Sequence, residues 1–114
     1  MQRYRLDISY DGTAYVGWQI QPNGLAVQAV IQTALQTLGG GPVKLHGSGR
    51  TDQGVHARCQ VAHVDLERPW APPRLLAALN ALMPPDIRIV RVAVVAHDFH
   101  ARHSVRIKEY RYFI

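Results

Sequence analysis

The chain has 114 residues, of which 47% are hydrophobic and 18% are charged, and thirteen Lys and Arg against eight Asp and Glu give a net charge of +5. This composition excludes a disordered chain and suffices for one small domain with a core of its own. No apolar run approaches the roughly 20 residues that span a bilayer. Cys59 is the only cysteine, which excludes an internal disulfide and favours the reducing cytoplasm. A small basic domain often binds nucleic acid, although a basic surface can also serve solubility alone.

The first half of the chain reads as a strand, a helix and a short strand. Residues 4–10 alternate apolar and polar side chains, which predicts a strand with one buried face. From Val27 to Leu38 the apolar residues recur at helical spacing, and the run Gly39-Gly40-Gly41-Pro42 predicts the end of that helix. Residues 43–46 predict a short strand that leads into a glycine-rich run.

The second half repeats this order. A strand is predicted over residues 60–66, and Pro72-Pro73 begin a helix that Pro84-Pro85 end. Residues 87–95 predict a strand whose alternation slips between Ile89 and Val90, which indicates a β-bulge. The order strand, helix, strand, strand, helix, strand predicts an α+β, ferredoxin-like or RRM-like sandwich with its core over about residues 3–96, and an additional strand follows at about 105–114.

One nine-residue run concentrates reactive side chains between two predicted strands, and it reads Gly49-Arg50-Thr51-Asp52-Gln53-Gly54-Val55-His56-Ala57. Glycine adopts backbone angles that other residues avoid, so such a loop can aim a side chain into a cleft. Asp52 is therefore the first candidate for an acid, base, nucleophile or ligand, and Arg50 can keep it ionised. Asp11 is a weaker second candidate, because an Asp-Gly pair is typical of a turn.

Two sets of residues have spacings that could ligate zinc: His56, Cys59 and His63, and His97, His100 and His103. Neither set completes a four-ligand pattern, and part of the first falls on a predicted strand. We therefore expect no metal site. No phosphate-binding or dinucleotide fingerprint is present in the sequence, and we expect no cofactor.

Four motifs, in order along nearly the whole chain, resemble the tRNA pseudouridine synthases of the TruA type. The resemblance is carried by these segments: Tyr10-Asp11-Gly12 with Gly17-Trp18-Gln19, GRTDQGVHA at 49–57, LNALMPPDI at 79–87, and FHAR at 99–102 followed by KEYRY at 108–112. Departures from the family pattern are small. Gln53 stands where alanine is usual, Met83 replaces leucine, and His103 stands where an aromatic residue is common.

The resemblance implies an enzyme that isomerises uridine to pseudouridine in tRNA, usually in the anticodon stem-loop, without a cofactor. Asp52 matches the catalytic aspartate, which acts as nucleophile or as base at the sugar. Tyr110 matches the tyrosine that stacks on the target base. Arg50, Arg58 and Arg102 are candidates for contacts with RNA phosphates or with the flipped nucleotide, and for Arg58 a plain solvated charge is an equal alternative. We expect His56 to order the loop by hydrogen bonding.

Members of this family are about twice as long as this chain. The resemblance implies two similar halves with the active cleft at their junction, and a homodimer that clasps one tRNA. We therefore expect residues 1–114 to be the N-terminal half of the catalytic domain and to be inactive or very slow alone. The alternative is a non-catalytic RRM-like RNA-binding module, which would gain nothing from a carboxylate in a basic loop. A third reading, phosphoryl transfer, lacks the further acidic residues expected for magnesium.

Overall fold

The computed structural model describes residues 1–49 and 57–104, so the predicted strand over 105–114 lies outside the described residues. The main elements follow the predicted order and are β1 (Gln2–Tyr10), α1 (Val27–Gly39), β2 (His46–Gly47), β3 (Ala57–Leu66), α2 (Pro72–Leu82) and β4 (Ile87–Val95). Two short elements were not predicted: the 3-10 helix η1 (Gly12–Ala14) and the helix α3 (Ala101–Ser104).

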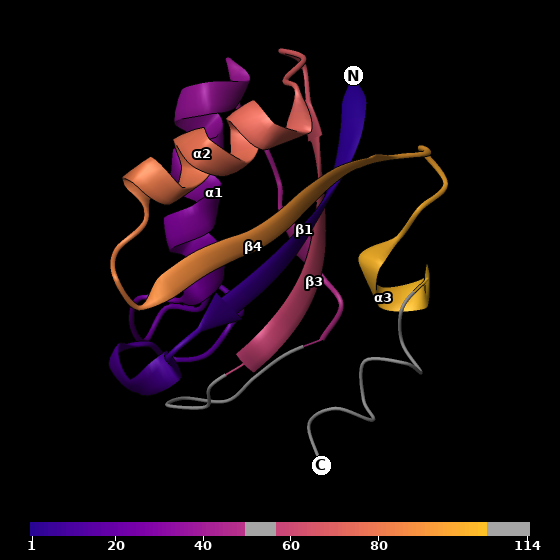
Figure 1. Cartoon of the computed structure of the whole chain (residues 1–114). Coiled ribbons are helices and arrows are strands. Elements are labelled where there is room, and N and C mark those ends of the chain that lie inside the picture. The colour runs from indigo at the N-terminus through magenta and orange to yellow at the C-terminus, as the bar shows by residue number, and fades with distance from the viewer. Residues whose placement is uncertain (50–56, 105–114) are drawn as a thin grey trace.

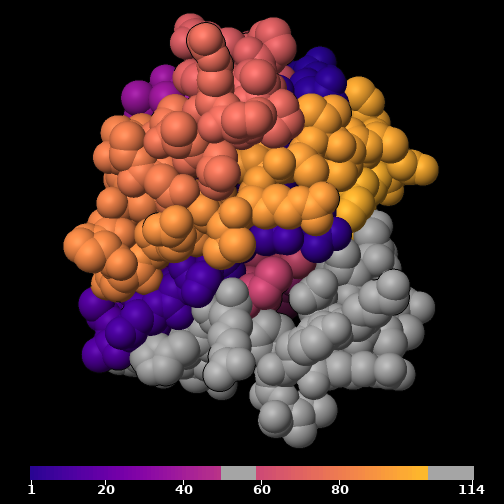
Figure 2. Space-filling view, viewed as in Figure 1, coloured from indigo at the N-terminus to yellow at the C-terminus, as the bar shows by residue number. Residues whose placement is uncertain are grey.

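The strands form one antiparallel sheet in the order β2-β3-β1-β4. The two long helices, α1 and α2, each connect two strands that are not neighbours, which is the split arrangement of a ferredoxin-like domain and confirms the predicted α+β fold class. The two long helices lie on one side of the sheet and α3 lies on the other (Figure 1). On the face shown in Figure 2, α2 and β4 form a continuous surface.

The core lies between the sheet and the two long helices. Alternate residues of β1 face it, as the period of two predicted, and β3 and both helices contribute to the same cluster, whose largest fully buried members include Tyr4, Leu6, Ile8, Ile31, Leu35, Leu66, Leu75 and Leu79. Burial of such side chains is worth about 1.5–3 kcal/mol each relative to leaving them exposed. The intervening residues of β1 include Arg3, Arg5 and Asp7, so the opposite face of this strand is polar.

The helix boundaries follow the glycine and proline signals. Gly40 lies just after α1 with φ of +83°, a left-handed conformation that favours glycine, and Pro72 and Pro73 open α2. The predicted bulge is also confirmed. Asp7 pairs with Arg91 and Ile8 pairs with Ile89, which leaves Val90 as the extra residue of β4.

The short strand predicted over residues 43–46 is displaced in the structure. Leu45 gives both of its backbone groups to side chains of α1: its N–H donates to Gln32 Oε1 (3.0 Å) and its carbonyl accepts from Gln28 Nε2 (2.7 Å). Because both backbone groups of Leu45 are occupied, the ladder with β3 begins only at the next residue, His46, which pairs with His63. Within the described residues, no helix has both the length and the apolar character to cross a membrane.

Candidate functional site

Most of the predicted site residues fall outside the described part of the chain. This applies to Arg50, Asp52, His56 and Tyr110 entirely, and to the side chain of Arg58, whose backbone belongs to β3. Arg102 is described and lies exposed in α3. The structure therefore shows the frame around the predicted catalytic run rather than the run itself.

Hydrogen bonds from β3 fix the approach to residues 50–56. Gln60 is buried, with 6% of its surface exposed, and its amide group makes two bonds: Nε2 donates to the Gly49 carbonyl (2.6 Å) and Oε1 accepts from the Ser48 hydroxyl (2.8 Å). The Ser48 N–H donates to the Val61 carbonyl (2.7 Å). The chain just before residue 50 is thus held by backbone and side chain together.

The far end of the same run is fixed by the sheet. Ala57 begins β3 and pairs with Tyr10, the last residue of β1. A register shift between Ile8 and Tyr10 marks an irregularity at this point. Gly49 and Ala57 are therefore both anchored to the sheet, and the seven residues between them start and finish at defined positions.

Gly47, in the strand just before Ser48 and Gly49, lies in close contact with Trp18. A Cβ added to Gly47 would lie 2.4 Å from the indole Nε1, so only glycine allows the strand to approach the ring. Trp18 is buried, with 2% exposed, and its ring stacks on Tyr10 at a centroid distance of 6.2 Å. Trp18 is thereby a packing anchor that links the first predicted motif to the approach of the glycine-rich run.

A cavity of about 260 Å³ lies between β2 and α3 and reaches Gly49. Residues distant in sequence line it, among them Trp18, Lys44, His46, Gly49, His100 and Arg102. Two of these carry full positive charge, and no carboxylate belongs to the described lining. The cavity therefore suits an anionic or hydrogen-bond-accepting group.

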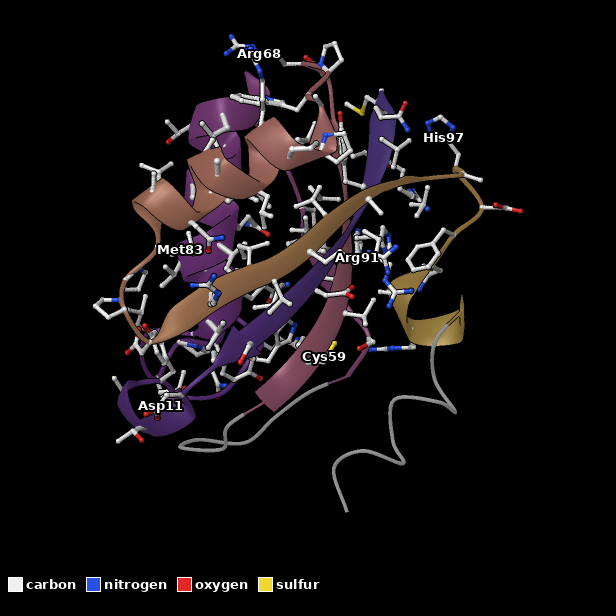
Figure 3. All side chains as sticks on the ribbon, in the orientation of Figure 1. Asp11, Cys59, Arg68, Met83, Arg91 and His97 are labelled. Carbon is white, nitrogen blue, oxygen red and sulfur yellow. The ribbon has the colours of Figure 1, made fainter. Side chains whose placement is uncertain are left out.

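Three histidines come together beside this cavity. One nitrogen from each of His46, His63 and His100 lies within 4.8 Å of the others. The rings of His46 and His63 are stacked at 4.7 Å, and His100 meets His63 edge-on at 4.6 Å. Each of the two sets whose spacing could ligate zinc contributes one residue to this group, but His97 lies elsewhere, with its ring nitrogen 2.7 Å from the Met1 carbonyl (Figure 3).

The hydrogen bonds of this cluster favour neutral imidazoles that support α3 rather than hold a metal. His63 Nδ1 accepts from the Ala101 N–H (3.1 Å) and His100 Nδ1 accepts from the Arg102 N–H (3.2 Å). A neutral ring that accepts at Nδ1 carries its proton on Nε2, so neither ring can also coordinate a metal through Nε2. Nearly parallel rings, as in His46 and His63, also do not aim their in-plane lone pairs at one point.

The electrostatics of the cluster agree with this protonation state. Burial, followed by the charges of His46, Arg3 and His100, lowers the pKa of His63 to about 4. Burial and then the Lys44 ammonium lower the pKa of His46. Both rings are therefore uncharged near neutral pH, and the positive charge of the described cavity lining belongs to Lys44 and Arg102.

The segment before α3 is also tied to the polar face of the sheet. Arg3 forms a two-point ion pair with Asp65 (2.8 and 2.9 Å) and donates a further bond to the Phe99 carbonyl (2.7 Å). Its hydrogen bond to Arg3 lowers the pKa of Asp65. The Arg5 guanidinium lies 5.9 Å from the centre of the Phe99 ring. These contacts, together with the Ala101 bond to His63, seat the segment that carries Arg102 against β1 and β3.

Other residues of the predicted motifs join parts of the fold. Asp11 accepts from the Thr13 N–H (3.0 Å) and hydroxyl (2.6 Å), which confirms the predicted turn. The Tyr15 hydroxyl donates to Asp86 (2.6 Å), and burial together with this bond raises the pKa of Tyr15. Asn80 exchanges two bonds with the backbone of Ile89, each 2.9 Å long.

Sequence reasoning missed Gln60 and Lys44. Gln60 occupies an inward position of a strand, where a polar side chain is unusual and indicates a specific hydrogen-bonding task. That signal was present in the alternation of residues 60–66. Lys44 gave no signal, because an exposed lysine before a strand is ordinary and its place beside Arg102 depends on the packing of α3.

Comparison with known proteins places the chain in a family. A model described as tRNA pseudouridine synthase matches residues 8–104. The chain is similar to proteins named tRNA pseudouridine synthase A from Exiguobacterium sibiricum (51% identical over 114 residues), Beijerinckia indica (51% over 115) and Rhodospirillum rubrum (50% over 115). Each alignment covers 100% of this chain but only 46%, 44% and 41% of the relative, so the chain spans less than half the length of these relatives. With most of its length matched by the family model, this chain belongs to the tRNA pseudouridine synthase family.

Proposed function

We propose that the protein carrying this chain converts uridine to pseudouridine in tRNA, with Asp52 as the nucleophile or base at the ribose. The reaction breaks the N1–C1′ bond of the nucleotide, turns the base and forms a C5–C1′ bond. The proton on C5 leaves to solvent, and N1 takes up a proton. No electrons are gained or lost, so the reaction needs no redox cofactor.

The observation that carries this proposal is the position of the Asp52 run within the matched region. The family match extends over residues 8–104 and includes the whole of GRTDQGVHA. Gln60 holds the chain at Gly49, and the sheet holds it at Ala57. A catalytic carboxylate requires such fixed supports, because a misplacement of about 1 Å can cost on the order of a hundredfold in rate.

The remaining predicted residues have roles in binding the substrate. Extruding a base from an RNA stem costs a few kcal/mol. We assign Tyr110 to stacking on that base, which is worth about 1–3 kcal/mol. Arg50, Arg58 and Arg102 provide positive charge for the phosphates, and His56 orders the loop. The exposed position of Arg102 on the cavity wall supports its part in this assignment.

The sheet surface counts against the alternative of an RRM-like binding module. Such modules stack bases on aromatic side chains of the open sheet face. Here the tyrosines of β1, Tyr4 and Tyr10, are buried in the core instead. On the other face β1 carries Arg3, Arg5 and Asp7, with both arginines engaged in ion pairs.

We further propose that residues 1–114 are the first half of a longer catalytic domain and that the whole enzyme is a cytoplasmic homodimer that binds tRNA. The coverage of less than half of each relative supports the first point. On this proposal the isolated chain shows no efficient turnover. Mass measurement of the longer protein by light scattering tests the dimer, and a monomeric mass that also binds one tRNA would contradict it.

The experiment that tests the reaction measures release of the C5 proton from an unmodified tRNA transcript. The longer protein is compared with its Asp52→Asn variant, which keeps the size of the side chain but loses the carboxylate. We expect release by the parent and none by the variant. Equal release by both proteins would show that Asp52 is misassigned. Binding of tRNA without release by the parent would favour a binding module.

A further inference from the structure

The cavity between β2 and α3 has features of a binding site beyond the part already assigned to Arg102. Its cations come from different elements: Lys44 precedes β2, and Arg102 lies in α3. Both side chains are exposed, and no carboxylate lines the described wall, so nothing in that wall neutralises their charge. Two like charges placed around one hollow repel each other, and an anion bound between them offsets that repulsion.

The wall that carries Arg102 is held in place rather than loosely attached. The N–H groups of Ala101 and Arg102 donate to Nδ1 of His63 and His100. His63 has only 2% of its surface exposed and stacks on His46, which belongs to the opposite wall. The stacked imidazoles thus join the two walls, and the separation of Lys44 and Arg102 is set by β2, β3 and α3 together.

The size and shape of the cavity limit the ligand. Its volume of about 260 Å³ is below the roughly 300–1,000 Å³ typical of pockets for drug-sized molecules. At the Gly49 end, an added Cβ would meet no atom of the described residues within 4 Å. The cavity therefore suits a group of the size of one phosphodiester unit.

We propose that this cavity is a phosphodiester subsite, in which Lys44 and Arg102 bind a backbone phosphate of the RNA next to the nucleotide held at Asp52. The assignment of the phosphate to RNA rests on the proposed function. This subsite also reduces an electrostatic repulsion, because the Asp52 carboxylate repels the RNA phosphates that must approach it. Lys44 and Arg102 supply positive charge that offsets that repulsion, and His63 acts as a positioning residue for Arg102.

The test is tRNA binding by the longer protein in an Asp52→Asn background, so that turnover does not enter the measurement. Lys44→Gln and Arg102→Gln are each titrated with tRNA at several KCl concentrations. Each substitution is expected to weaken binding by about threefold to tenfold and to reduce the slope of log affinity against log salt by about one. Lys44→Arg keeps the charge and should retain most of the affinity.

Arg74→Gln is the matched control, because it removes the same charge from an exposed side chain of α2. Arg74 lines a separate surface hollow with Arg68, beyond the end of β3 that lies farthest from the Asp52 run (Figure 3). It should change affinity and salt slope much less than the cavity variants do. Equal effects from all three substitutions would mean that only the overall charge matters, and would overturn the proposal.

Inorganic phosphate distinguishes an RNA phosphate from a free anion. At matched ionic strength, phosphate should displace tRNA from the parent more than chloride does, and this excess should vanish in Lys44→Gln. If the variants lose phosphate binding but bind tRNA like the parent, the cavity holds a free anion and the RNA assignment is wrong. If the cavity variants weaken binding while the longer protein with Asp52 intact forms no pseudouridine, the subsite stands and the catalytic proposal fails.

Discussion

The side-chain amide of Gln60 donates to the carbonyl oxygen of Gly49 across 2.6 Å, and its oxygen accepts from the neighbouring Ser48 hydroxyl. One buried residue of β3 therefore holds the chain that leads into the Asp52 run. Both ends of the glutamine amide are used, so neither a carboxylate nor an apolar side chain can replace it fully. If the catalytic proposal is right, turnover should depend on this hydrogen bond, and a substitution of Gln60 can measure that dependence.

Replacing Gln60 with Glu should lower turnover without a matching loss of tRNA affinity. The new carboxylate would still accept from Ser48, but it cannot donate to the Gly49 carbonyl and would repel it when ionised. We expect kcat to fall on the order of tenfold to a hundredfold, because the entry to residues 50–56 shifts. Gln36→Glu, the same change at an exposed site of α1, is the control. An unchanged kcat for Gln60→Glu would show that this anchor is not needed.

Replacing Asn80 with Ala should destabilise the fold rather than impair chemistry. Its amide pairs with both backbone groups of Ile89, beside the bulge at Val90, where the ladder of β4 is irregular. Loss of two such bonds is expected to lower the free energy of unfolding by about 2 kcal/mol. Urea unfolding measures the change, with the exposed Asn23→Ala as control. A stable Asn80→Ala protein with low activity would instead indicate a role in catalysis.

Replacing Gly47 with Ala should disrupt the contact with Trp18. The added methyl group would lie 2.4 Å from the indole nitrogen, so the strand or the ring must move. Overpacking of this kind costs about 1–3 kcal/mol. Gly41→Ala is a matched control, because its Cβ would meet only Glu67 at 4.0 Å. Thermal unfolding compares the two variants, and equal melting temperatures would contradict the close packing described here.

The lowered pKa values of His63 and His46 predict that the free energy of unfolding decreases as the pH is lowered. The pKa of His63 is about 4 in the folded chain against 6.5 for the free side chain, so the unfolded state binds the proton more readily. The contribution of the neutral His63 ring to the free energy of unfolding is complete above pH 6.5. It is lost as the pH falls from 6.5 to about 4. The upper limit is about 3 kcal/mol. The lowered pKa of His46 acts in the same direction.

The groups that face His63 include Arg3 and Arg5 of β1, His46, His100 and Asp65, and of these only Asp65 favours the protonated ring. His63→Gln keeps an oxygen that can accept from Ala101 and removes the titrating ring. Urea unfolding across this pH range should therefore show a shallower dependence in the variant. The same slope in both proteins would show that His63 is not the group responsible.

Much of the fold followed from the sequence because local physics controls it. The alternation in residues 4–10 and the helical spacing from Val27 specify which faces are buried. Glycine and proline mark where α1 ends and α2 begins. The slip after Ile89 located the bulge at Val90. The glycine-rich run and the other motifs identified the family and the candidate residue Asp52, since those patterns are contiguous in the chain.

The tertiary structure alone decided which distant residues meet. β2 is displaced because glutamines of α1 bind the backbone of Leu45, and no periodicity reveals that competition. His46, His63 and His100 converge because the register of β2 with β3 and the seat of α3 place them together. The same packing brings Lys44 and Arg102 to the lining of one cavity. Strand register and helix docking depend on the summed burial of the whole core, and a local pattern does not contain that sum.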